Sequence, residues 1–218
     1  MSHDTAAAQA CALLWVTRSA GVLRGLTHRF SNGLHALSLM GVDGRDDLAP
    51  EDAVLIRAEL DQFEVLTEQY RTLVLALEEE TSAGRVEDAL TLALALRGAH
   101  VAVRDAEVTP VVVGEPPAVL AAPTALAQAI LLLVLGDAPD QGETPLLRLS
   151  GDETAAVLEI RASQYAHADV SLDAGVHWLL RATQPAVALV RTTDADGPVV
   201  RLTLPSLRAS RRASQAAG

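Results

Sequence analysis

A heptad repeat of apolar residues between positions 56 and 77 constrains the fold more than any other feature of the chain. Its members alternate at spacings of four and three, include one polar residue, and are Ile56, Leu60, Phe63, Thr67, Tyr70, Val74 and Leu77. This spacing lays one apolar seam along a helix. Pro50, followed by the acids Glu51 and Asp52, is typical of a first helical turn. The pattern therefore predicts a long helix that starts near residue 49.

A second long helix is predicted over residues 6–40, upstream of a turn at residues 41–47. Its apolar residues recur at spacings of three and four, apart from an interruption near Thr27. Two long helices joined by a short loop make an antiparallel hairpin, and a single apolar seam is not buried by one hairpin alone. Pairing two hairpins into a four-helix bundle solves this, so the sequence predicts a homodimer. The alternative is that the hairpin packs only on the rest of its own chain.

One face of the first helix is polar and carries two histidines. At 3.6 residues per turn this face combines Arg24, His28, Ser31, Asn32, His35 and Ser38. The opposite face is apolar, so His28 is predicted to point to solvent. An exposed imidazole on a rigid helix can accept a phosphoryl group or act as an acid–base.

The remainder of the chain mixes helices with strands. Helices are predicted at residues 86–97, 123–135 and 172–183. Strands are predicted at residues 100–104, 111–113, 146–150, 156–162, 186–192 and 198–204, the last two forming a hairpin around the 194–197 turn. This mixture predicts an α/β sandwich with helices on one face of a mixed sheet.

The overall fold class is therefore α+β, with three parts. Residues 1–82 form the helical hairpin, residues 83–207 form the α/β sandwich, and residues 208–218 form a polar tail that we expect to be disordered.

Charge and composition exclude several classes of protein. The net charge of −11 argues against a nucleic-acid partner. Cys11 is the only cysteine and no set of histidines has metal-ligand spacing, so neither a disulfide nor a metal site is expected. The longest apolar run, residues 129–135, is far below the roughly 20 residues of a membrane span. We expect a cytoplasmic protein that does not bind a membrane.

A helical hairpin with an exposed histidine, followed by an α/β sandwich, resembles two-component histidine kinases. Their dimerisation and phosphotransfer domain precedes an ATPase-like domain of the GHKL type. The stretch from His28 to Leu34 is similar to that family's phosphoacceptor box, with an apolar residue two positions after the histidine, Asn32 four positions after and Leu34 six positions after. Arg29 after the histidine matches variant subclasses of the family.

The chain departs from the family where the resemblance implies a nucleotide site. Two asparagines that bind phosphates and magnesium would fall near Leu132 and Gly136, and neither position is Asn. The family's Asp-x-Gly-x-Gly loop would follow the strand ending at Ala162, but residues 163–169 contain no glycine. We therefore expect no ATP binding and no cofactor in this chain.

A phosphoacceptor helix without an ATP site suggests a histidine phosphotransferase, which relays phosphoryl groups to or from response-regulator receiver domains. His28 is the expected acceptor, Arg24 an attractor of phosphoryl oxygens and Asn32 a group that orients the imidazole; Arg29 replaces an acid that many kinases use as a base. His35 shares the stripe and is the alternative acceptor. The resemblance places the required Mg²⁺ on the partner receiver domain. Two alternatives stay open: a divergent kinase that phosphorylates itself, and a non-catalytic dimeric adaptor or kinase inhibitor.

Overall fold

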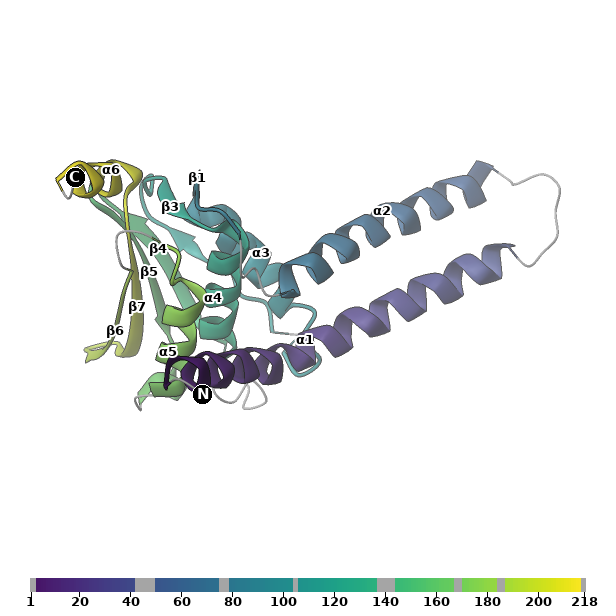
Figure 1. Ribbon diagram of the computed structural model, residues 1–218. Helices are drawn as coiled ribbons and strands as arrows, with labels where there is room; N and C mark the ends of the chain where they lie inside the picture. The colour runs from purple at the N-terminus through teal and green to yellow at the C-terminus, as the bar shows by residue number, and fades with distance from the viewer. Residues whose placement is uncertain are drawn as a thin grey trace.

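The computed structural model describes residues 3–41, 50–74, 79–103, 106–136, 144–166, 170–183 and 187–216. Its first part is a pair of long helices, α1 (His3–Gly41) and α2 (Pro50–Leu73), which run antiparallel and project from a compact second part (Figure 1). The predicted helical hairpin is confirmed. The turn predicted between the helices lies at residues 42–49, outside the described residues.

Aromatic rings hold the two helices together. The ring of Phe30 lies 5.2 Å from that of Phe63 and meets that of Tyr70 edge-on at 5.5 Å. The Thr27 hydroxyl lies 2.6 Å from the Tyr70 hydroxyl, and Leu66 is buried beside this cluster. Edge-on pairs of this kind add to the stability that area burial supplies.

The predicted heptad seam of α2 divides into two sets of residues. Phe63 and Tyr70 pack on α1, whereas Leu60 and Val74 remain exposed, and Leu77 lies outside the described residues. One facing helix covers only part of the seam, because the seam is wider than a single helix contact.

The second part is built on a five-stranded mixed sheet in the order β2-β4-β5-β7-β6. Strand β2 (Val111–Val112) runs parallel to β4 (Leu146–Gly151). Strands β5 (Ala155–Arg161), β7 (Gly197–Pro205) and β6 (Ala188–Asp194) follow in antiparallel pairs. Alternate residues of the central strands are buried, which is the pattern of a sheet covered on one face.

Three helices cover that face of the sheet: α3 (Val86–Arg97), α4 (Pro123–Leu135) and α5 (Val170–Leu179) (Figure 1). Helix α4 packs against both of the others and is the centre of the core. The predicted α/β sandwich is confirmed, and the helix expected over residues 172–183 is shorter and ends at Leu179.

Two short elements differ from the sequence prediction. Residues 100–103 form turns instead of a strand, with the Val103 amide donating to the His100 carbonyl at 3.2 Å. The alternation of His100, Val101, Ala102 and Val103 suits a strand, but these residues follow the end of α3 directly and have no neighbouring strand to pair with. The sequence also missed β1 (Ser82–Gly84) and β3 (Val119–Ala121), which pair antiparallel in a small separate ladder.

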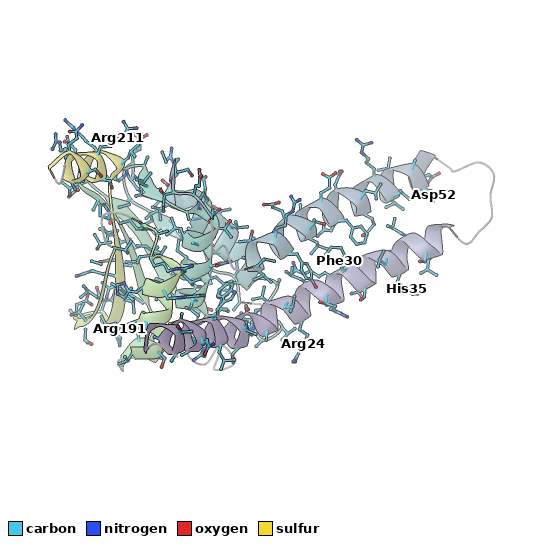
Figure 2. The ribbon with its side chains drawn as sticks, viewed as in Figure 1. Arg24, Phe30, His35, Asp52, Arg191 and Arg211 are labelled. Atoms are coloured by element: carbon cyan, nitrogen blue, oxygen red, sulfur yellow. The ribbon has the colours of Figure 1, made fainter. Side chains whose placement is uncertain are left out.

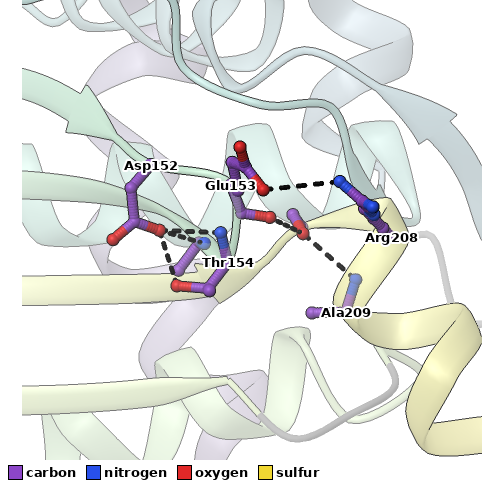
Figure 3. A network of polar contacts seen from close by, with 7 residues as sticks. Asp152, Glu153, Thr154, Arg208 and Ala209 are labelled. Carbon is purple, nitrogen blue, oxygen red and sulfur yellow. Dashed lines mark hydrogen bonds and ion pairs between the residues drawn. The ribbon is translucent and has the colours of Figure 1, made fainter.

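The chain ends in a helix, α6 (Leu207–Ala216), where the sequence predicted a disordered tail. Figure 3 shows how it is attached. The Ser206 hydroxyl accepts a hydrogen bond from the Ala209 amide at 3.1 Å and donates one to the Glu153 carbonyl at 2.8 Å. The Arg208 guanidinium lies 3.4 Å from the Glu153 carboxylate. A serine cap anchored to the β4–β5 turn gives this polar segment a helical start.

Side chains from other elements bind the backbone at the base of the hairpin. The last carbonyls of a helix have no partner within it. The Gln128 amide of α4 donates to the Thr72 and Val74 carbonyls, both at 2.7 Å, and the Trp15 indole donates to the Leu73 carbonyl at 3.2 Å. The end of α2 is thereby joined both to α1 and to the core helix of the sandwich.

Candidate functional site

The polar stripe predicted on α1 is exposed. His28, His35 and Arg24 are all solvent-exposed. Figure 2 shows Phe30 directed into the space between the two helices, with Arg24 and His35 on the side of α1 away from α2. The aromatic cluster therefore fixes the rotation of α1 so that the histidine face meets solvent.

His28 and Asn32 are neighbours within the stripe. The Asn32 side-chain nitrogen lies 3.4 Å from Nε2 of His28. When the amide donates, Nε2 accepts and the proton of the neutral ring resides on Nδ1. A contact of this length is a weak hydrogen bond, which biases the orientation of the ring without immobilising it. It brings together two of the residues that the sequence selected.

Arg29 lies in a different environment from that expected. Its guanidinium donates to the Gly98 carbonyl at the end of α3, at 2.8 Å. Carbonyls at a helix C-terminus carry partial negative charge, which favours a cation there. Arg29 thus links the histidine-bearing segment of α1 to the sandwich, a role that its position beside His28 in the sequence did not suggest.

Two glycines let α1 approach the turn after α3. A Cβ atom on Gly25 would lie 1.6 Å from the Ala99 carbonyl oxygen, and one on Gly21 would lie 2.0 Å from Nε2 of His100. Both distances are far inside van der Waals contact, so only glycine fits at either position. Gly21, Gly25 and Arg29 follow each other at four-residue intervals and form the face of α1 that docks on the sandwich.

Helix α4, which corresponds to the nucleotide-binding helix in the resemblance, has no solvent-exposed face over its length from Ala125. Every residue from Ala125 to Leu135 is at most 4% exposed. A helix that is apolar all round is a core helix. The Tyr165 hydroxyl donates to the Leu133 carbonyl, so the short helix η2 (Ser163–Ala166) closes one side of α4. That helix occupies the start of the stretch where the glycine-rich loop was sought, and residues 167–169 lie outside the described residues.

Comparison with protein-family models finds no match, and neither does comparison with curated proteins. Among solved structures, the chain is similar to the histidine kinase AdeS from Acinetobacter baumannii, with 14% identity, a TM-score of 0.46, and coverage of 85% of this chain and 97% of that chain. A histidine kinase from Burkholderia phymatum STM815 is similar with 17% identity, a TM-score of 0.41, and coverage of 88% and 97%.

A third similar structure is the histidine kinase ThkA in complex with the response regulator protein TrrA, at 11% identity and a TM-score of 0.44 over 86% of this chain and 60% of that chain. The chain thus resembles two-component histidine kinases in the order of a helical hairpin and an ATPase-like domain. These values describe a shared arrangement of elements, and we argue function from the residues of this chain.

The close approach at Gly25 can be tested by substitution. In an unconstrained helix, Gly→Ala stabilises by about 1 kcal/mol. We expect Gly25→Ala to have the opposite sign and to lower the free energy of unfolding by about 1–3 kcal/mol, because the added methyl group overpacks the contact with Ala99. Urea denaturation followed by circular dichroism measures the change.

Gly84→Ala is the matched control, since a Cβ there would meet no atom within 4 Å. A Gly25→Ala protein as stable as Gly84→Ala would contradict the docking of α1 on the turn.

Proposed function

We propose that this protein is a histidine phosphotransferase, which relays phosphoryl groups to or from response-regulator receiver domains through His28 and binds no ATP of its own. The observation that carries the proposal is the pairing of an exposed histidine on a fixed helix with a buried α4. His28 is open to a partner protein, whereas α4 offers a nucleotide no surface between Ala125 and Leu135.

The chemistry requires little of this chain. The lone pair of a neutral His28 ring nitrogen attacks the phosphorus of a regulator's aspartyl phosphate in line, forming a P–N bond as the P–O bond to the carboxylate breaks. The reverse reaction recharges a second regulator. The regulator supplies the Mg²⁺ and the lysine that neutralise developing charge. His28 contributes the nucleophile, Asn32 orients its ring, and Arg24 attracts the phosphoryl oxygens.

The positions of the two sites favour a relay over self-phosphorylation. Gln128 of α4 and Trp15 of α1 bind adjacent carbonyls at the end of α2, so α4 lies at the level of Trp15. Trp15 and His28 are thirteen residues apart, or about 20 Å along the helix. Group transfer requires reacting atoms to approach within about 3–3.5 Å. A nucleotide on α4 would lie far from His28 in this arrangement, whereas a separate receiver domain reaches it directly.

We also propose that the protein is a homodimer through its hairpin. Val16, Leu23 and Leu34 of α1 are 59%, 45% and 58% exposed. Leu34 is nine residues from Gly25, about two and a half turns, and so lies on the side of α1 opposite to the sandwich. On α2, exposed Leu60 stands nine residues from the buried Gln69 and likewise faces away from the buried side. Two hairpins packed on this apolar side would form the four-helix bundle.

We place the protein in the cytoplasm, with neither a membrane nor a nucleic acid as partner. Within the described residues, the stretch Thr5–Leu39 is long and apolar enough to cross a membrane by length and composition, although the sequence predicted no such span. That stretch includes Arg18, Arg24 and Arg29, and it packs along the markedly charged α2. Paired helices of this charge favour an aqueous setting.

The identity of the acceptor is tested by phosphotransfer from phosphorylated receiver domains of the source organism. We expect His28→Ala to abolish label on this protein and His35→Ala to retain at least half of the wild-type rate, because only His28 has Asn32 one turn away. Acid-labile label is measured over time for each variant. Label that persists without His28 would remove it as the acceptor, and full regulation of the pathway without His28 would favour the adaptor function.

The dimer is tested by reversing the character of its proposed face. Leu34→Glu/Leu60→Glu should halve the mass measured by light scattering at about 50 μM, since burying carboxylates at an apolar interface is costly. The control is Val54→Glu/Val65→Glu, which adds the same charge at exposed positions on another side of α2. Equal masses for the two double variants would contradict this interface.

A further inference from the structure

A groove of about 610 Å³ lies between the N-terminal half of α1 and the start of α5. Its walls include Ala10, Leu13 and Thr17 of α1 and Val170 and Ala174 of α5. The two helices lie side by side at this end of the molecule (Figure 1). The groove is separate from the polar stripe and from α4.

The groove is apolar and its edges are exposed. Leu13 is 67% exposed and Val170 is 78% exposed. Cys11 also lines it, and burial raises the pKa of the Cys11 thiol, which therefore stays neutral and behaves as a small apolar group. Large apolar side chains left open on both walls are typical of a protein-binding surface.

The groove faces the same direction as His28. Ala10 and His28 are eighteen residues apart, five full turns of α1, and so lie on one side of the helix. Thr17 and His28 are eleven residues apart, about three turns and about 16 Å along the axis. A small globular domain is about 30 Å across, so one domain seated at His28 spans the distance to the groove.

We propose that this groove is a second docking site for the receiver domain that exchanges phosphate with His28, and that it receives an apolar segment of that domain's surface. The inference rests on the proposed function. A stable protein interface buries about 800 Å² on each partner and has an apolar core within a polar rim. The His28 stripe supplies only polar side chains, whereas the groove supplies the apolar core on the same face of α1.

A second copy of this chain fits the groove less well than a receiver domain. The apolar side proposed for the dimer carries Leu34, which is six residues from His28 and therefore about a third of a turn away around α1. The partner subunit would occupy that side and leave the His28 face and its groove open. The two surfaces can thus be used at once, as a dimer that docks regulators requires.

The test combines two acidic substitutions with two readouts. Leu13→Asp/Val170→Asp places charge on both walls of the groove, and Asp at the first turn of α5 suits the helix N-terminus. The control is Val111→Asp/Val190→Asp, which adds the same charge at exposed positions of the edge strands β2 and β6. Steady-state transfer from the phosphorylated receiver gives KM and the maximal rate, and fluorescence anisotropy gives the affinity for the unphosphorylated receiver.

We expect the groove variant to raise KM and weaken receiver binding at least tenfold relative to the control, with the maximal rate within twofold of wild type. Values equal to the control would overturn the groove while leaving the proposed function intact if His28→Ala still abolishes transfer. If transfer persists in His28→Ala, the proposed function fails, and the anisotropy still decides the groove. Loss of the wild-type mass in the groove variant would assign the groove to contact between copies and overturn the proposal.

Discussion

The contact on which the arrangement depends is the docking of α1 on the turn that follows α3. Gly25 lets the Ala99 carbonyl lie against the helix backbone, and Arg29 binds the Gly98 carbonyl from the next turn. The aromatic cluster around Phe30 fixes α1 against α2 from another direction. Because His28 lies between residues held on two sides, its exposure is set by packing rather than by a flexible loop. A rigid display of this kind reduces the entropy lost when a partner docks.

The buried α4 gives the sandwich a structural task. Its Gln128 binds the last carbonyls of α2, and its apolar residues form the centre of the core. A helix that must release and bind a nucleotide needs an open face, and packing has closed that face here. Under the proposed function, the sandwich braces the hairpin and supplies one wall of the groove beside α5, while the reactive phosphate arrives on another protein.

Much of this structure could be predicted from local patterns. Heptad spacing predicted the hairpin, Pro123 and the apolar run after it predicted α4, and the 3.6-residue period predicted an exposed His28. The short ladder of β1 with β3 could not be predicted, because each strand is only three residues long and depends on a distant partner. The helix at the C-terminus was missed because its stability depends on a cap anchored by Glu153.

The candidate site shows the same limit. The spacing of Arg24, His28 and Asn32 was enough to place them on one face of a helix. The sequence indicated that Gly21 and Gly25 permit a close approach, but not that the approaching group is the turn at residues 98–100. Arg29 was selected for its place in a motif, and its contact with Gly98 joins residues 69 positions apart. Contacts at such separations leave no periodic trace in the sequence.

The central claim is that His28 is charged by a partner protein and not by ATP. The most direct measurement offers the full-length protein both phosphate sources, each labelled in a separate reaction: ATP with Mg²⁺, and a phosphorylated receiver domain with Mg²⁺. The account predicts acid-labile label on this protein from the receiver domain within minutes and none from ATP over hours. Label from ATP that is lost in His28→Ala would contradict the account and identify the protein as a self-phosphorylating kinase.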